Sequence, residues 1–517
     1  MADIVIVGGG FSGTLAAIEA LNRSKQTGGI DEVILVEKAK GQTCGGVAYS
    51  KVTAAAYHET NIAAKNMGMP GDPQELARQM HVDAKKVMPR RLVQEFMQAA
   101  LNAAKTYKPG DAFRPAKFTR IDGEAVDVID GDDHAKVKLK HGKAIEAQSV
   151  ILATGNLQLR EIPCVTDGDI RDKFFRQHFV RNQWLDDEQK KIAKIPASEP
   201  VLIIGTALSA YDAARSLLRQ GHAGKIVMMS RHGLEHFRYP ENHDWKDLDL
   251  PTPKFLEYVL DRDWAGAKAA AEKEFHDLTS LKVDMDAGTI TPDSNWQRMF
   301  SAVTGRKTYL PEQVLKQWEK TVPGIADELG AQRVGQFLKK YSALISVLRV
   351  GAGDAICAEI EAAKERGQLS VVAADIDGVI PNHDADGLVV RFTPHGESKP
   401  QYQRFHTVIS SLGPDHDYTH TQSRLWQNMF RRGYTGAHPV GIGVRASTND
   451  NEFGRLPHAN RIFAAGVSTA GNNVIKKGLT GPPAFSVPGM RDGVIKTADA
   501  VVDAVLREKR GRSPSPF

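Results

Sequence analysis

The chain has 517 residues, a length that suggests roughly two to four domains. Hydrophobic residues make up 41% and charged residues 25%, values that argue against disordered, collagen-like and fibrous classes. The net charge of +5 is small for this length and is not typical of a nucleic-acid-binding protein. The three cysteines are far apart, so a dithiol centre, a disulfide framework and a zinc ribbon are all unsupported, and we expect no metal.

The start of the chain runs directly from Met-Ala-Asp into an apolar segment. It has neither the basic segment nor the long apolar stretch of a secretory signal. No run reaches the ~18 apolar residues that a membrane helix needs. We therefore expect a cytoplasmic protein without a membrane partner.

The first motif occupies residues 4–24, an apolar strand followed by a glycine turn and apolar residues at helical spacing. Gly8, Gly10 and Gly13 form G-x-G-x-x-G in the context that a dinucleotide site requires. The three glycines permit the tight turn, the close approach of a pyrophosphate and close helix–strand contact. The phosphate is then expected at the start of the helix, beside Phe11 and Ser12.

A second apolar strand, residues 33–36, ends in Glu37 and Lys38. A carboxylate at this position accepts hydrogen bonds from ribose hydroxyls and repels a 2′-phosphate. The first site is therefore predicted to take the adenosine half of FAD or NAD.

The chain then departs from a simple dehydrogenase pattern, with a glycine-rich stretch (41–49), strand patterns at 125–129 and 135–139, and an Ala-Thr-Gly turn after a strand at 150–152. This layout is typical of flavoproteins with two dinucleotide sites, so FAD is the cofactor predicted for the first. The remaining predicted FAD-binding residues are Ala48, Asn61, Thr154, Gly155, Gly466 and Asn472.

A second strand–turn–helix motif begins at residue 201, with Gly205, Thr206 and Ser209 at the predicted pyrophosphate turn. Alanines replace its second and third glycines, which predicts looser binding, as suits an exchangeable nicotinamide cofactor. The next strand ends in Ser230, Arg231 and His232, donors that suit a 2′-phosphate, so NADPH is predicted. A structural unit with an ordinary surface arginine is the alternative.

The predicted fold class is α/β, with two Rossmann-like dinucleotide-binding domains. Residues 1–163 and 402–517 are assigned to a discontinuous FAD domain and residues 164–401 to an NADPH domain. Helical patterns at 255–260, 267–278, 312–320, 334–348 and 355–366 indicate a helical insertion, residues 250–368. The insertion is interpreted either as a cover for a substrate pocket or simply as a packed bundle. A closing helix is predicted at 492–506.

Five segments resemble motifs of a bacterial group of FAD/NAD(P)-binding proteins related to class B flavin monooxygenases and N-hydroxylating monooxygenases. Residues 46–49 look like its G-V-A-Y turn and 60–64 like its L-N-V-P-A segment, while 178–182 look like the approach to its second Rossmann unit, which often reads G-T-G-L-T-x-x-D. Residues 230–233 resemble its S-R-R-G and 487–491 its V-P-E-I-R. The resemblance implies FAD and NADPH as cofactors. Ala207 and Gly489 depart from the group's pattern.

Three functions are compatible with these motifs. The first is an NADPH-using FAD monooxygenase that hydroxylates a small polar metabolite through a C4a-(hydro)peroxyflavin, with oxygen as co-substrate. An anionic metabolite is one form of this hypothesis. The second is an NAD(P)H-dependent FAD oxidoreductase or dehydrogenase without oxygen transfer. The third is a nucleotide-binding protein without turnover.

No triad or metal cluster identifies catalytic residues. His58, Asn61 and Arg349 are candidates, although the first two could instead satisfy backbone groups and Arg349 could pair with an acid. Four basic residues could bind an anionic substrate or simply be solvated: Arg90, Arg91, Lys476 and Lys477. The sequence assigns neither a particular substrate nor an oligomeric state.

Overall fold

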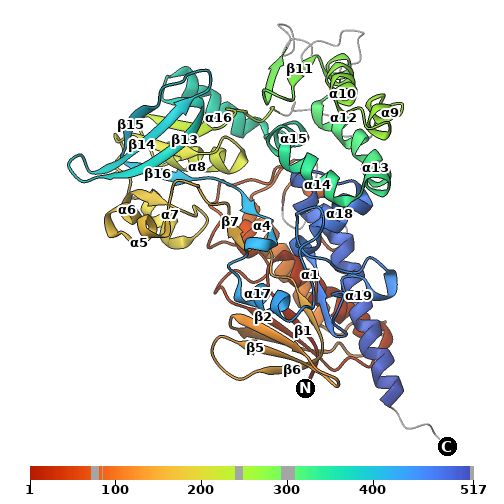
Figure 1. Ribbon diagram of the computed structural model, residues 1–517. Helices are drawn as coiled ribbons and strands as arrows, with labels where there is room; N and C mark the ends of the chain where they lie inside the picture. Colours follow the sequence, from red (N-terminus) through yellow and green to blue (C-terminus); the bar gives the residue numbers. More distant parts are fainter. Residues whose placement is uncertain (72–77, 79–80, 84–85, 239–247, 293–308, 513–517) are drawn as a thin grey trace, which may run out of the picture.

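The computed structural model describes residues 1–71, 78, 81–83, 86–238, 248–292 and 309–512. It contains two α/β units, each built on a seven-stranded sheet, and a mostly helical insertion. In Figure 1 the first unit lies at the bottom, the second at the upper left and the insertion at the upper right. The predicted fold class is confirmed.

The first sheet has the order β3-β2-β1-β6-β5-β4, and β18 also pairs with β6. Its parallel strands are β1 (Ala2–Val7), β2 (Glu32–Glu37), β3 (Lys117–Asp122), β6 (Ile145–Leu152) and β18 (Ile462–Ala464). The predicted meander is the antiparallel pair β4 (Ala125–Asp130) and β5 (Ala135–Leu139).

Alternate residues of β1 serve two different cores. Ile4 and Ile6 face a layer of three helices, α1 (Phe11–Thr27), α4 (Arg90–Lys105) and α19 (Val487–Arg512). Val5 and Val7 face the opposite layer, where α17 (Arg424–Arg431) contributes the buried Trp426. The sheet is therefore covered on both faces, which explains why β1 is apolar at almost every position.

The second sheet has the order β15-β14-β13-β10-β9-β16-β8. Its parallel part comprises β8 (Phe179–Val180), β9 (Val201–Ile204), β10 (Ile226–Ser230), β13 (Leu369–Asn382) and β16 (Thr407–Ser410), and β14 (Gly387–Pro394) and β15 (Gln401–Phe405) extend it as antiparallel strands. The helices α8 (Leu208–Arg219) and α16 (Asp354–Glu365) cover one face, and α6 (Lys173–His178) contacts the other.

Two predicted boundaries are corrected by this sheet. The return to the first unit was predicted at residue 402, but β15 and β16 both belong to the second sheet, so the second unit continues to Ser410. The insertion was predicted to reach residue 368, yet α16 packs with α8 and is the crossover helix between β10 and β13. Neither error could be seen locally, because sheet membership depends on distant neighbours.

The chain crosses between the units through two short strands. β7 (Gln158–Leu159) leaves the first unit, β17 (Pro414–Asp415) returns to it, and the two pair antiparallel. The second unit is therefore inserted into the first through a neck of two adjacent segments.

The helical insertion is likewise connected to the second unit through two adjacent segments. Its two ends meet where Arg238 pairs with Ala352, and the Ala352 amide donates to the carbonyl of Phe237 at 2.8 Å. Between them lie α9 (Phe255–Leu260), α10 (Trp264–Thr279), β11 (Leu281–Asp284), β12 (Thr289–Pro292), α12 (Pro311–Trp318), η2 (Glu319–Thr321), α13 (Val322–Leu329), α14 (Ala331–Lys340) and α15 (Ser342–Arg349).

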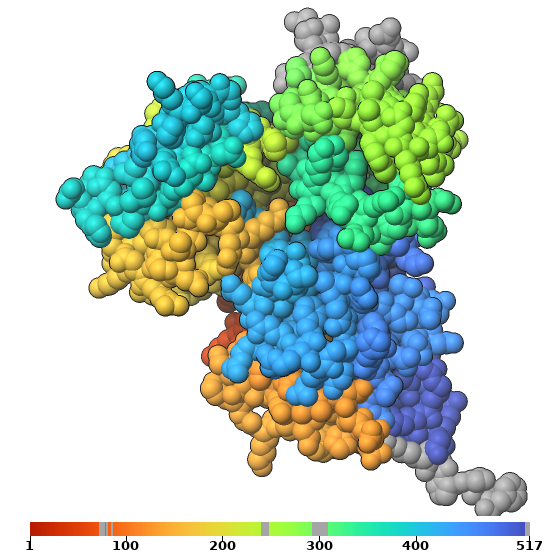
Figure 2. All heavy atoms as spheres, viewed as in Figure 1, coloured from red at the N-terminus to blue at the C-terminus, as the bar shows by residue number. Residues whose placement is uncertain are grey.

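The insertion also rests on the first unit. Ala326 of α13 and Val334 of α14 share a core with Val474 of α18 (Ala470–Lys477) and Ala484 of η6 (Pro482–Phe485). Figure 2 shows the insertion as a lobe of its own above the first unit and beside the second.

The helical predictions are confirmed for the insertion and α16, with one break: the segment predicted at 334–348 is divided at Tyr341 into α14 and α15. The closing helix begins at Val487, earlier than predicted. The remaining short elements are α2 (Gly46–Tyr49), η1 (Ala64–Asn66), α5 (Asp167–Arg171), α7 (Asp186–Ile192), η3 (Tyr418–His420), η4 (Asp450–Glu452) and η5 (Gly466–Thr469). Among the described residues, no helix combines the length and the apolar character that crossing a bilayer requires.

Candidate functional site

The glycine turn after β1 brings three backbones into close contact. A Cβ on Gly13 would lie 1.7 Å from the carbonyl oxygen of Gly8, and a Cβ on Gly8 would lie 2.2 Å from the carbonyl oxygen of Ala153. Gly8 also has a φ of +102°, a conformation that residues with side chains rarely adopt. Glycine is therefore required at both positions for α1 to begin directly against the sheet.

The start of α1 is left open for a ligand. Gly10 is the N-cap of α1 and no side chain caps the first turn, which contains Phe11, Ser12 and Gly13. Unsatisfied N–H groups at a helix start attract a phosphate.

Two further segments enclose this turn. The Cys44 amide donates to the Gly9 carbonyl at 2.7 Å, and a Cβ on Gly10 would lie 3.4 Å from the Cα of Gly46. From the other end of the chain, Gly466 approaches Ser12 so closely that its Cβ would lie 2.5 Å from the Ser12 hydroxyl. The cradle is thus assembled from three parts of the sequence.

Glu37 is already fixed beside the turn. It is buried, and its two carboxylate oxygens accept hydrogen bonds from the amides of Gly9 (2.6 Å) and Ala39 (2.8 Å). The neighbouring Lys38 is exposed. A carboxylate held at the end of β2, next to a glycine cradle, fits the adenosine half of FAD.

The other predicted FAD residues lie around the cradle with less direct support. Thr154 accepts a hydrogen bond from the Trp426 indole at 3.0 Å and precedes Gly155 at the end of β6, and Asn472 of α18 donates to the carbonyl of Ala446 at 3.2 Å. Ala48 is exposed on α2, and Asn61 is half-buried in the loop that follows His58. Their contact with FAD stays a prediction.

The second glycine turn has the same design with different side chains. α8 begins after Ala207 without a side-chain cap. The Thr206 hydroxyl lies 2.9 Å from that of Ser230, which in turn accepts the Gly233 amide at 3.1 Å, while the Ser209 carbonyl accepts the Gln183 amide at 2.8 Å. The turns after β9 and β10 are therefore tied to each other.

Arg231 and His232 follow this tie. Arg231 is exposed and makes no hydrogen bond or ion pair with the described residues, and the Nδ1 of His232 is covered yet has no partner. Burial lowers the pKa of His232, and the Arg231 guanidinium lowers it further. The free Arg231 guanidinium at the end of β10, with the His232 ring beside it, fits a 2′-phosphate.

The two cofactor sites are joined by an ionic interface. Arg90, at the start of α4, lies 2.9 Å from the buried carboxylate of Asp212 in α8, and its guanidinium also covers the Trp184 ring at 5.3 Å. Arg215 of α8 binds Glu359 through two nitrogens (3.0 and 3.2 Å) and the Tyr57 carbonyl through a third. The helix of the second nucleotide turn is therefore bound directly to the first unit.

His58 belongs to the same interface. Its ring packs edge-on against Trp184, and its Nε2 lies 3.4 Å from the Ser216 hydroxyl of α8. Burial lowers its pKa to about 4, although the Asp212 carboxylate opposes the change, so the ring is neutral near pH 7. The structure thus places His58 as a neutral contact between the units, and Arg91 beside it donates to the Ala54 carbonyl.

Arg349 takes the role that the sequence left as its alternative. It is 5% exposed and pairs with Glu312 and Glu319, each at 3.0 Å. Glu319 also accepts the Thr480 amide at 2.7 Å and the Thr480 hydroxyl, which ties the insertion to the segment after α18. Of the two lysines on α18, Lys477 lies 3.7 Å from Asp492, whereas Lys476 is exposed.

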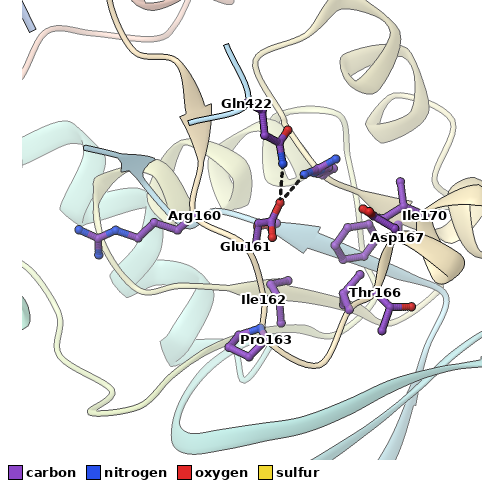
Figure 3. A pocket seen from close by; sticks show the side chains of 12 residues that line it. Arg160, Glu161, Ile162, Pro163, Thr166, Asp167, Ile170 and Gln422 are labelled. Carbon is purple, nitrogen blue, oxygen red and sulfur yellow. Dashed lines mark hydrogen bonds and ion pairs between the residues drawn. The ribbon is translucent and has the colours of Figure 1, made fainter. Parts of the chain in front are cut away.

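A separate pocket lies beside the neck between the units (Figure 3). Glu161 stands in its wall, and its carboxylate accepts hydrogen bonds from Gln422 at 3.0 Å and Arg181 at 3.1 Å, while Arg160 points away. The central polar groups of this pocket satisfy one another, so it is not assigned a ligand. In the described ranges, no group of three or more His, Cys, Asp or Glu could hold a metal ion.

Sequence reasoning missed three residues around the site. Asp212 belongs to the second motif, which could have singled it out, but its partner Arg90 is remote in sequence. Glu319 gives no local signal, because an acid in a helical pattern is usually solvated. His416, after β17, stacks on Phe485 with ring centroids 3.5 Å apart, and burial lowers its pKa to about 3.

Comparison with protein families gives one match, to the family described as FAD-NAD(P)-binding, over residues 5–157. Those residues contain the glycine turn after β1, Glu37 and the Thr154–Gly155 turn. Over these residues the first unit is similar to that family. A comparison with curated proteins gives no match.

Solved structures that share the fold of the whole chain include several hydroxylases and monooxygenases. The ornithine hydroxylase of Pseudomonas aeruginosa, in its reduced form, superposes with a TM-score of 0.58 at 12% identity, over 98% of this chain and 99% of that one. The Kutzneria sp. 744 ornithine N-hydroxylase with reduced FAD, NADP⁺ and L-ornithine gives 0.56 at 12% identity, covering 98% and 100%. The L-lysine 6-monooxygenase of Pseudomonas syringae gives 0.55 at 12%, covering 98% and 100%. At 12% identity this similarity establishes the fold of the chain and nothing more.

The first prediction concerns the cradle. Wild-type protein should be yellow with one FAD per chain, and Gly10→Ala should bind FAD at least about tenfold more weakly, because its methyl group obstructs the approach of a charged phosphate. Absorbance of the heat-released cofactor measures FAD, and circular dichroism checks the fold. Gly13→Ala is the contrasting variant, expected to damage folding itself. Unchanged FAD content in Gly10→Ala would contradict the assignment.

The second prediction concerns Arg349. Arg349→Met should lower the free energy of unfolding by about 3–5 kcal/mol, because it leaves buried glutamates without their cation. Urea denaturation measures this change, with Arg333→Met on an exposed position of α14 as the control. Normal stability with lost activity would instead make Arg349 a substrate contact.

Proposed function

We propose that the protein is an FAD-dependent, NADPH-using monooxygenase that hydroxylates a small polar metabolite. The proposal depends on one observation above all. The helix of the second nucleotide turn, α8, is bound to the first unit through Arg90–Asp212 and Arg215–Tyr57, so a cofactor on each turn would occupy neighbouring parts of one fixed interface.

The chain's own residues would act by binding and orientation. The open start of α1 and the Glu37 carboxylate would hold the adenosine half of FAD, and α8, Arg231 and His232 would hold NADPH. FAD, when bound, supplies the redox chemistry by accepting a hydride from NADPH and delivering electrons to oxygen. One oxygen atom would enter the substrate and the other would leave as water.

The insertion would exclude water from the reacting centre. Its helices α13 and α14 rest on α18, the helix that follows the Gly466 turn of the FAD cradle, and the Glu319–Thr480 contact holds them there. Anionic metabolites are the first substrates to test, because Lys476 of α18 is exposed and without an ion pair in the described structure.

The third prediction separates oxygen transfer from a dehydrogenase reaction. With its substrate, the protein should couple NADPH oxidation to oxygen uptake in equal amounts and form a product heavier by one oxygen atom. An oxygen electrode and mass spectrometry with ¹⁸O₂ make the measurement. Equal turnover in the absence of oxygen, with another electron acceptor, would favour the FAD dehydrogenase instead.

The fourth prediction concerns the nicotinamide cofactor. Arg231→Ala should raise the NADPH Michaelis constant by about 10- to 150-fold and leave NADH nearly unchanged, because a charge-assisted hydrogen bond to the 2′-phosphate is lost. The effect should shrink in high salt, since Arg231 is exposed. Arg238→Ala is the matched control, because that side chain already pairs with Asp354 and Glu361. An equal loss for both nucleotides would assign Arg231 a structural role.

A further inference from the structure

The insertion contacts the loop after β10 in two ways: Leu234 and Phe237 of that loop pack against the insertion's apolar core, and the tip of the β11–β12 hairpin meets His232. Gly288 is buried at this tip, and a Cβ there would lie 2.6 Å from Nδ1 and 2.7 Å from Cε1 of His232. The three nearest atoms around that position all belong to His232. The hairpin therefore meets the ring that follows β10 with no side chain between them.

The tip is a rigid part of the insertion. The Asp284 carboxylate accepts the amides of Asp286 (3.0 Å) and Ala287 (2.9 Å), which fixes the turn. The Met285 amide donates to Glu272 of α10 at 2.8 Å, and Lys268 of α10 pairs with Asp286. Lys268 offsets the charge of Asp286, and the Asp284 carboxylate is directed to the amides of its own turn.

His232 is held in place from two sides. Its ring meets the ring of His395 edge-on, with centroids 5.7 Å apart, and it also contacts the hairpin at Gly288. Its covered Nδ1 has no partner, and the unpaired Arg231 is its neighbour in sequence. An anion at this point would meet the Arg231 guanidinium and the edge of a confined imidazole, and the Asp375 carboxylate, 3.9 Å from His395, would oppose it.

We propose that the β11–β12 hairpin is a wall of the 2′-phosphate site, and that Gly288 is a specificity-determining position because it sets the His232 ring against the phosphate. Selectivity for a 2′-phosphorylated nucleotide then depends on the insertion as well as on the second unit. This inference rests on the proposed use of NADPH.

The test uses FAD-saturated protein and two probes that differ only in the 2′-phosphate, 2′,5′-ADP and 5′-AMP, with affinities measured by titration calorimetry. Gly288→Ala should weaken 2′,5′-ADP about tenfold, the loss of one charge-assisted contact, and leave 5′-AMP unchanged. Gly330→Ala is the matched control: it lies in the same insertion, also has a positive φ (+86°), and its Cβ would meet nothing within 4 Å.

A double-mutant cycle separates the ring contact from backbone strain. In a His232→Ala background the new methyl group no longer meets the imidazole, so Gly288→Ala should have no further effect on 2′,5′-ADP. Far-ultraviolet circular dichroism checks that each variant is folded. If Gly288→Ala does not fold, the affinity of His232→Ala for 2′,5′-ADP tests the role of the ring.

The outcomes are distinct. If wild-type protein binds both probes equally, the proposed NADPH preference fails. If the wild type prefers 2′,5′-ADP, three results would show that the hairpin is no part of the site. Gly288→Ala could have the same affinities as Gly330→Ala, or it could lose affinity for both probes equally. It could also lower the affinity for 2′,5′-ADP as much in the His232→Ala background as in the wild type. A selective loss that disappears in the double variant supports it.

Discussion

The close contact between the start of α1 and the ends of β1 and β6 is the constraint on which the rest of the structure depends. Because no side chain fits at Gly13 or Gly8, the helix begins against the sheet and its first amides stay open. Four distant segments then converge there: Glu37, the amide of Cys44, Thr154 and Gly466. These four segments therefore meet at the same end of the first sheet.

The second unit is inserted into the first, and the helical insertion into the second, in both cases through two adjacent segments. Short necks alone would let the lobes swing, but buried charges oppose that motion. Asp212 faces Arg90 between the units, and Glu319 receives Arg349 on one side and Thr480 on the other. Moving the lobes apart would break the Arg90–Asp212 pair and the Glu319–Thr480 hydrogen bonds, whereas Arg349 would stay with Glu319 inside the insertion. We expect the lobes to move as one body around the cofactors.

Much of the first unit could be predicted from the sequence because its signals are local. A strand, a glycine turn and a helix identify themselves within about twenty residues, and Glu37 follows at a standard interval. The boundary predicted at residue 402 was wrong because β16 looks like an ordinary apolar strand until its neighbour β9 is known. Arg349 was left ambiguous and Asp212 was missed for the same reason: an ion pair between residues remote in the chain leaves no pattern in either segment. Gly288 and its hairpin were not predicted at all, because the contact with His232 joins segments remote in the chain.

The pairing of α1 with α19 has a consequence for synthesis. Leu15 and Leu21 of α1 share a core with Val494, Val501 and Val505 of α19, yet the chain between Thr27 and Val487 must be made first. At ribosomal speeds this interval lasts about 25 to 90 seconds. Throughout it, the nascent first unit displays an unpaired apolar helix face and lacks the Gly466 wall of its cradle. The second unit, whose strands lie between residues 179 and 410, can meanwhile close its own sheet on the ribosome. The first unit, into which the second is inserted, is thus the last to be completed.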